Sequence, residues 1–451
     1  MTKAFVFRSR GEIEAVQEAK FAETMDLVAK GHPYYRELLS RNGLSRADFR
    51  GLSDLPKLPI TRKDDYMRAP DRFRLGISDL PEEMRAVWDV MYTTGSTTGQ
   101  PTPFVSTSFD FFRILDLHRN MLALRAVRPD DVIANLFPVT IWPHGAFIRT
   151  LHAAASMNLR VVAALPGNPS PHFVLGSALD EVVRTIERSR ATVLWGVPSY
   201  VRRVVARAEE LGADFRPVRL AFVTGEGMPE AVRNDLTAAM RRIGSAAAWV
   251  SISYGSTETQ GGLVECAPGS GYHNPAPDQF YFEVVDPDTH RPVEDGVPGL
   301  VLLTHLQRRG TLLMRYALGD ISVQSHAQCP HCGAWTDRLV AMPRRADALV
   351  KIKGMLVNPD VLVQAAQAEL GARDYQFIIG RTTPDSPLAT DTLVLKLSAD
   401  THDQNLATRL AEAIKRATGV TPEVEFVSTG AIADSAGAWK TKRVIDTRPK
   451  D

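Results

Sequence analysis

Short apolar segments alternate with amphipathic segments through about the first 340 residues, and this alternation constrains the fold more than any other feature of the chain. The apolar segments have the length of strands and lie at 131–137, 159–165, 191–197 and 218–224. Helical patterns occupy 178–189, 199–211 and 229–243. Such alternation predicts the α/β class, with mostly parallel, helix-covered sheets in a large N-terminal domain. In these sheets, ligands bind at the carboxyl ends of the strands.

The pattern changes near Asp347, where smaller elements begin. Helices are expected over 359–370 and 404–418, and strands over 392–397 and 423–427. These elements are typical of a compact α+β unit. We therefore expect two domains, a large one over 1–345 and a small, mobile C-terminal lid over 346–451.

The charge and hydropathy of the chain exclude several classes of partner. Its formal net charge of +1 over 451 residues gives no electrostatic reason to expect nucleic acid or an acidic membrane as partner. No apolar run approaches the roughly 20 residues of a membrane span, and the first residues lack the apolar core of a signal peptide. We expect a cytoplasmic protein.

Hydroxyl side chains and glycines crowd together at 92–102, in the sequence YTTGSTTGQPT. Glycine lets the backbone approach an anion closely, and amides together with Ser and Thr hydroxyls can donate hydrogen bonds to phosphate oxygens. The segment lacks the Gly-Lys-Ser/Thr of a P-loop, which disfavours a kinase or GTPase, and an ordinary surface turn is the alternative. The candidate phosphate-binding residues are Thr94, Gly95, Ser96, Thr97, Thr98 and Gly99.

Two consecutive predicted strands end in polar segments that contain glycine. The first supplies Gly225, Glu226 and Gly227, and the second supplies Tyr254, Gly255, Ser256, Thr257 and Glu258. The second segment offers an aromatic face, hydroxyls for phosphate and, at Glu258, a hard oxygen ligand for Mg²⁺. Farther on, Asp320 could accept hydrogen bonds from both hydroxyls of a ribose. Each segment alone is equally consistent with a strand that runs into a polar loop.

The chain has only three cysteines, and this small, odd number argues against a disulfide framework. Cys329 and Cys332 form a C-x-x-C pair, and Cys266 lies upstream with His273 seven residues beyond it. Three thiolates and one imidazole suffice for a tetrahedral zinc site if the fold brings them together. The alternative is a buried Cys266 beside an unrelated pair. His331, between the two cysteines, is a competing fourth ligand.

In this order, the motifs resemble those of adenylate-forming enzymes of the acyl-CoA synthetase superfamily, and specifically the phenylacetate-CoA ligase family. The resemblance runs from 92–102 through 225–227, 254–258, 316–320 and Arg345-x-Asp347 to a lysine near the C-terminus. The phenylacetate-CoA ligase branch is indicated by LPITRKDD at 58–65, GVPSY at 196–200, EC at 265–266 and KRVID at 442–446. The similarity spans nearly the whole chain.

The resemblance implies a reaction in two steps with ATP, Mg²⁺ and coenzyme A (CoA). A carboxylate first attacks the α-phosphate of ATP, which gives an acyl-adenylate and pyrophosphate, and a thiol then displaces AMP to form a thioester. Catalysis of this kind depends on positioning and on neutralising charge.

Roles for individual residues follow from the same resemblance. Residues 94–99 would hold the pyrophosphate end of ATP, Glu258 would bind Mg²⁺, and Thr257 would contact the α-phosphate. Residues 225–227 and Tyr254 would flank the adenine. Asp320 would accept the ribose hydroxyls, and Arg345 would contact the nucleotide.

The catalytic lysine of the family corresponds to Lys440, with Lys442 as a close rival. A mobile ammonium there could bridge the attacking carboxylate and the α-phosphate. Asp347 fits the hinge about which the lid would rotate between the two half-reactions. The chain departs from the family at Gln100, where a lysine is usual in the phosphate loop, and at Trp439, where a glycine precedes the catalytic lysine.

The phenylacetate-CoA ligase branch suggests an aromatic acid of the phenylacetate or substituted benzoate type. Candidate walls for its ring are Phe137, Trp142, His144 and Tyr254, and simple core packing is the alternative for each. His144 could instead read a hydroxyl or amino group on the ring.

Two competing functions remain open from the sequence. In the first, the acyl group would pass to the phosphopantetheine of a carrier protein and not to free CoA. The oligomeric state is a separate question, and a homodimer is left open. A non-catalytic, zinc-stabilised binding protein with the same fold is the alternative of another class, disfavoured because Glu258, Asp320 and Lys440 are all present.

Overall fold

The computed structural model describes residues 7, 9–93, 101–139, 145–167, 175–346, 350–353, 355–370, 373–382, 390–399, 402–428, 432 and 443–448. Several predicted site residues lie outside these ranges. They are 94–99 of the phosphate loop, Trp142, His144, Asp347 and Lys440.

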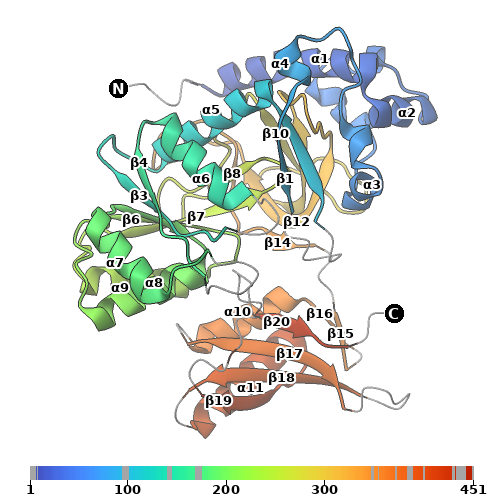
Figure 1. Cartoon of the computed structure of the whole chain (residues 1–451). Coiled ribbons are helices and arrows are strands. Elements are labelled where there is room, and N and C mark those ends of the chain that lie inside the picture. Colours follow the sequence, from blue (N-terminus) through green and yellow to red (C-terminus); the bar gives the residue numbers. More distant parts are fainter. Residues whose placement is uncertain are drawn as a thin grey trace.

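A twelve-stranded sheet forms the centre of the larger part of the molecule (Figure 1). In spatial order its strands are β10 (Phe280–Val285), β11 (Pro298–His305), β12 (Tyr316–Ser325), β13 (Arg338–Leu339), β9 (Tyr272–His273), β8 (Gly261–Val264), β7 (Trp249–Ser256), β6 (Leu220–Thr224), β5 (Val193–Gly196), β3 (Val132–Asn135) and β4 (Arg160–Ala163), and β14 (Arg344–Arg345) pairs with β12.

The strands from β7 to β4 pair in parallel, which confirms the α/β class expected from the alternating pattern. Their connecting helices are α6 (Gly145–Ser156), α7 (Leu179–Ser189), α8 (Pro198–Leu211) and α9 (Glu230–Arg242). In α8, Val201, Val204, Val205 and Ala208 form the buried stripe that packs on the sheet, and Gly212 ends the helix in a left-handed conformation. The helix α5 (Ser108–Leu124) lies across β8 and packs against α6.

The other half of the sheet is antiparallel, which differs from the expectation of mostly parallel pairing. After β7 the chain turns back within four residues into β8, and this connection is too short for a crossover helix. Parallel pairing is therefore confined to the five strands that are joined by helices. Within the antiparallel half, β9 and β13 join β8 to β12, and each of them has only two residues.

The N-terminal segment packs on the antiparallel half of the sheet, near the top of Figure 1. Its helices are α1 (Arg10–Gly31), α2 (Pro33–Arg41), η1 (Arg46–Asp48), η2 (Leu52–Lys57), α3 (Lys63–Arg68), η3 (Pro70–Phe73) and α4 (Glu82–Arg85). The antiparallel strands β1 (Val87–Tyr92) and β2 (Pro103–Thr107) follow them. Among the described residues, no helix is both long and apolar enough to cross a membrane.

The C-terminal segment forms a separate four-stranded sheet with its own hydrophobic core (Figure 1). Its elements are β15 (Val350–Ile352), β16 (Met355–Val357), α10 (Pro359–Leu370), β17 (Tyr375–Arg381), β18 (Asp391–Ser398), α11 (Gln404–Thr418), β19 (Glu423–Val427) and β20 (Val444–Asp446). The expected helices at 359–370 and 404–418 match α10 and α11. The division of the chain at residue 345 stays a prediction.

Candidate active site

The carboxyl ends of β6 and β7 lie side by side, so the two polar segments predicted from the sequence are neighbours in space. Thr224 is in register with Ser253, and its hydroxyl donates to the carbonyl of Ser253 at 3.2 Å. Gly255 is required here, because a Cβ at this position would lie 2.9 Å from Thr224 Oγ1. The backbone around Tyr254 is therefore fixed against the end of β6.

Glu226 has a partner other than the predicted nucleotide. Its carboxylate accepts hydrogen bonds from Ser199 Oγ at 2.9 Å and from the Ser199 amide at 3.1 Å. Ser199 lies in the first turn of α8, where unsatisfied amides and the helix dipole favour an anion. Glu226 thus joins the loop after β6 to the start of α8, while Gly225 and Gly227 are exposed beside it.

Tyr254, Asp320 and Arg345 form a polar constellation across three strands. The Tyr254 phenol donates to Asp320 Oδ2 at 2.5 Å, and Arg345 Nη1 lies 3.8 Å from Asp320 Oδ1. Asp320 and Arg345 face each other in the register of β12 and β14. Burial, followed by the charge of Asp320, raises the pKa of Tyr254, so the phenol remains a donor at neutral pH. The structure therefore places the predicted adenine-flanking and ribose-binding residues together.

Gly319 makes room for this arginine. Its φ is +81°, and a Cβ there would lie 3.1 Å from Arg345 Nη1. The guanidinium also donates to the carbonyl of Leu318 at 3.1 Å. A side chain at position 319 would strain the backbone and displace Arg345 from Asp320.

Glu258 lies in the turn between β7 and β8, and its side chain is partly buried. The Tyr316 phenol donates to its Oε1 at 3.3 Å, and the His305 ring nitrogen Nε2 lies 3.1 Å from its backbone carbonyl. Burial raises the pKa of Glu258. Nearby, the Gln260 side-chain amide donates to the backbone carbonyl of Thr257 at 2.6 Å. This contact does not involve the Thr257 hydroxyl, which is the group predicted to contact the α-phosphate.

Tyr316 and His305 were not assigned roles from the sequence. Tyr316 belongs to the motif that leads to Asp320, but a strand tyrosine gives no sign that its phenol reaches a glutamate 58 positions earlier. His305 ends β11 and has no local motif at all. Both contacts depend on how β11 and β12 pack against the turn after β7.

The strands β1 and β2 form an antiparallel pair on either side of the predicted phosphate loop. Thr93 and Thr102, which flank the loop, hold its base: the Thr93 amide donates to the Thr102 carbonyl, and the Thr102 amide donates to Thr93 Oγ1, each at 3.0 Å. The loop residues themselves lie outside the described part of the chain, as do Asp347 and Lys440.

Phe137 is the only predicted substrate wall, apart from Tyr254, that lies among the described residues. It follows β3 and is 1% exposed within the large hydrophobic core. From β3 the chain passes through α6 to β4, whereas from the neighbouring β5 it passes through α8 to β6, on the other side of the pair in the strand order. The carboxyl ends of β3 and β5 therefore form a topological switch point. Ligands of α/β sheets bind at such a switch point.

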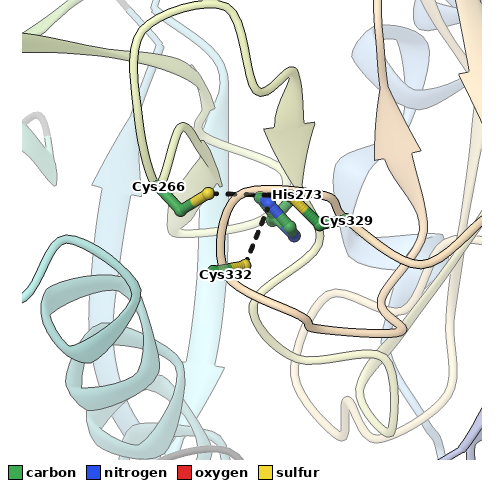
Figure 2. Close-up of side chains that lie close together, drawn as sticks. All are labelled: Cys266, His273, Cys329 and Cys332. Atoms are coloured by element: carbon green, nitrogen blue, oxygen red, sulfur yellow. Dashed lines mark hydrogen bonds between the residues drawn. The ribbon is translucent and has the colours of Figure 1, made fainter.

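Cys266, His273, Cys329 and Cys332 form a compact cluster (Figure 2). Their ligand atoms all lie within 4.8 Å of one another. The Cys266 and Cys329 sulfurs are 3.8 Å apart, and Cys332 Sγ is 3.7 Å from His273 Nε2. A tetrahedral zinc ion with bonds of roughly 2.3 Å to sulfur and 2.0 Å to nitrogen gives edges of about 3.8 Å between two sulfurs and about 3.5 Å between sulfur and nitrogen.

The second ring nitrogen of His273, Nδ1, has a contact that is consistent with metal binding through Nε2. This nitrogen lies 2.9 Å from Thr336 Oγ1, a contact that orients the ring and leaves Nε2 toward the sulfurs. His331, the competing ligand, is exposed and is not part of the cluster. The cluster joins β9 to the turn between β12 and β13, within the antiparallel half of the large sheet.

Comparison with known proteins gives one family and a set of relatives. Residues 63–307 match the family model of AMP-binding enzymes. The chain is 28% identical to a phenylacetate-coenzyme A ligase of Thermus thermophilus, with 97% of each chain covered. It is 25% identical to a phenylacetate-coenzyme A ligase of Escherichia coli, with 97% of this chain and 95% of the relative covered.

A solved structure of 2-hydroxyisobutyryl-CoA ligase in the postadenylation state has a similar fold. The TM-score is 0.78, with 20% identity, and the match covers 98% of this chain and 91% of the other. At this identity the likeness concerns the fold alone.

Proposed function

The chain belongs to the AMP-binding enzymes, and we propose that it is an AMP-forming ligase that joins an aromatic carboxylic acid to CoA. ATP-dependent activation of an acid through an acyl-adenylate, followed by thioester formation, is the reaction that the family and the full-length ligase relatives support. The constellation of Tyr254, Asp320 and Arg345 beside the end of β7 is the observation that carries the proposal.

The first step forms a bond between a carboxylate oxygen of the acid and the α-phosphorus of ATP, and pyrophosphate leaves. In the second step the CoA thiol, having lost its proton, attacks the acyl carbon, and AMP leaves with the bonding electrons. Neither step needs a covalent enzyme intermediate, so the protein contributes orientation and charge neutralisation.

We assign the charge-neutralising roles to Glu258, as a ligand of Mg²⁺, and to Lys440, which would bridge the acid and the α-phosphate. The position of Glu258 in the turn after β7 supports its role, because a metal there would lie beside Thr257 and the Tyr254 segment. Asp320 would accept from the ribose hydroxyls while it also accepts from Tyr254. Residues 94–99 would hold the pyrophosphate, since Thr93 and Thr102 fix the base of their loop.

We further propose that the C-terminal sheet is a lid that rotates about Asp347. Its separate core, built from residues between Ile352 and Val444, supports movement as a unit. The adenylation pose would bring Lys440 to the nucleotide, and a second pose would admit CoA. A cytoplasmic location, where ATP and CoA are available, is part of the same proposal.

We also propose that the cluster of three cysteines and His273 holds a structural Zn²⁺. The donor set leaves no open position for a substrate, which is typical of structural sites. When bound, the ion would cross-link β9 to the turn after β12. The pairing of β9 with β13 has only two residues on each strand, so a metal there would stabilise this narrow part of the antiparallel half.

A pyrophosphate-exchange assay tests the proposed function. The purified protein is incubated with ATP, Mg²⁺, labelled pyrophosphate and one of a panel of aryl acids, and label is followed into ATP. Exchange that depends on the acid is expected for at least one member. Absence of exchange with every acid of the panel would refute the ligase.

Addition of CoA in the same assay identifies the acceptor. Formation of an acyl-CoA thioester is expected by mass spectrometry. Exchange without thioester formation would instead indicate another acceptor, such as the phosphopantetheine of a carrier protein.

A further inference from the structure

Arg125, which has none of the roles assigned above, is a fully buried arginine at the C-terminal end of α5. Its side chain has no exposed surface. One nitrogen, Nη2, donates to Ser253 Oγ, whereas Nε and Nη1 have no hydrogen-bond partner among the described residues. Buried N–H groups of a charged side chain are rarely left unpaired, because the cost of removing them from water is then not offset.

The charge of Arg125 is also unbalanced within the described part of the chain. The carboxylate that influences it is Glu265, which is already bound to Arg233 Nη2 at 2.9 Å and to the Ile252 amide at 2.8 Å. Burial lowers the pKa of Arg125 to about 9, partly opposed by Glu265, so the guanidinium remains protonated at neutral pH.

Two aromatic rings form the walls around this guanidinium. Its central carbon lies 4.3 Å from the ring centre of Phe222 and 5.8 Å from that of Trp195. The two rings meet edge to face at 5.4 Å. Cation–π contacts stabilise the faces of the guanidinium but leave the N–H groups in its plane available.

The location connects Arg125 to the proposed site. Ser253, its hydrogen-bond partner, directly precedes Tyr254 in β7. Trp195 and Phe222 lie in register on β5 and β6, within two residues of the carboxyl ends of these strands. Arg125 thus lies beneath the strand ends that carry the proposed nucleotide-binding residues, with the rings of Phe222 and Trp195 beside it.

We propose that Arg125 determines substrate specificity by pairing with a second, hydrogen-bond-accepting substituent on the acid, and that a carboxylate is preferred. The N–H groups of Nε and Nη1 remain to donate to an acceptor, and the negative charge of a carboxylate would balance the buried cation. This inference rests on the proposed function, because it concerns the acid that the same site activates.

The test compares acids that differ only in the distal substituent. Pyrophosphate exchange is measured with benzoates and phenylacetates that carry a carboxylate, a nitro group or a methyl group at each ring position. At one position the wild type is expected to show at least ~10-fold higher kcat/KM for the carboxylated acid than for the methyl acid, with the nitro acid between them.

Arg125→Met keeps much of the side-chain length and removes the charge and the donors. We expect it to lower kcat/KM for the carboxylated acid by about 10- to 100-fold, with the KM for ATP unchanged and the methyl acid used as well as or better than before. Arg219→Met is the matched control. Arg219 forms an ion pair with Asp131 away from the strand ends, so its loss should affect thermal stability and leave the order of acids unchanged.

The outcomes separate the two proposals. A wild type that prefers methyl or unsubstituted acids at every ring position would overturn the role of Arg125, and this result needs no folded variant. Equal losses for all acids in Arg125→Met would also overturn it, since that is the effect of a structural residue. Absence of exchange with any acid would instead refute the proposed function, and the inference with it.

Discussion

The phenol of Tyr254 donates a hydrogen bond to Asp320, although the two residues are 66 positions apart and belong to strands in different halves of the large sheet. One oxygen of the carboxylate is held by this phenol, and the other faces Arg345 at 3.8 Å. The contact orients an acidic group at the place where the family is expected to bind ribose. It therefore couples the parallel half of the sheet to the antiparallel half at the candidate site.

Removal of the Tyr254 phenol should weaken nucleotide binding through Asp320. For Tyr254→Phe we expect the KM for ATP to rise by about 10-fold, because one hydrogen bond to a charged group is lost. Asp320→Asn should have a larger effect, since it removes the acceptor for the ribose as well. Steady-state kinetics with saturating acid measures both variants, and an unchanged KM for ATP in Asp320→Asn would argue against the ribose role.

Glu258→Gln should impair adenylation more than binding of the acid. Loss of the metal ligand is expected to lower kcat by about 100- to 1,000-fold and to raise the Mg²⁺ concentration needed for half-maximal exchange. Tyr316→Phe keeps the carboxylate and loses only a 3.3 Å contact, so a much smaller loss is expected. A Mg²⁺ requirement that is the same in Glu258→Gln and the wild type would contradict the assignment.

The catalytic lysine can be distinguished from its rival by a pair of variants. Lys440→Ala is expected to reduce pyrophosphate exchange by at least ~100-fold, because no cation would then bridge the acid and the α-phosphate. Lys442→Ala should retain most of the exchange activity. The reverse result would transfer the role to Lys442.

The proposed zinc site predicts one zinc ion per chain in the purified protein, measured by elemental analysis. Cys329→Ser, which changes a buried ligand, should abolish the bound zinc and lower the Tm by at least about 5 °C. His331→Ala is the matched control, because this exposed histidine lies between two ligands and outside the cluster. Purified protein that contains no zinc would rule out the site.

Buried neutral histidines predict that stability falls in mild acid. Burial lowers the pKa of His32 to about 4 and that of His118 to about 3. In the unfolded chain each imidazole binds a proton below about pH 6.5, while the folded protein does not, so each contributes a loss of about 1.4 kcal/mol per pH unit between pH 6.5 and its folded pKa.

This slope can be measured by urea unfolding at pH 7 and pH 5. His118→Gln retains a donor for the carbonyl of Gln260, which His118 Nε2 contacts at 3.0 Å, and it should reduce the dependence on pH even if stability at pH 7 also falls. The same dependence in this variant and the wild type would show that other groups dominate.

Much of the fold was predictable because the relevant signals are local. The buried stripe of α8 repeats every three or four residues, so the helix is visible in the sequence, and the C-terminal helices were placed correctly for the same reason. The antiparallel half was not anticipated. Its pairing depends on which strands meet after the turn that follows β7, and short apolar runs do not encode the direction of their partners.

The sequence by itself determined the family, the order of the site motifs and the donor types of the proposed metal site, since each is a matter of residue identity and spacing. Only the tertiary structure decided which groups meet. In the structure, the Glu226 carboxylate accepts a hydrogen bond from Ser199 at the start of α8, and the Tyr316 phenol donates to Glu258. Arg125 is buried against the rings of Phe222 and Trp195, without a carboxylate partner among the described residues. These contacts join segments far apart in the chain, and their energies depend on packing and desolvation, which spacing along a sequence does not record.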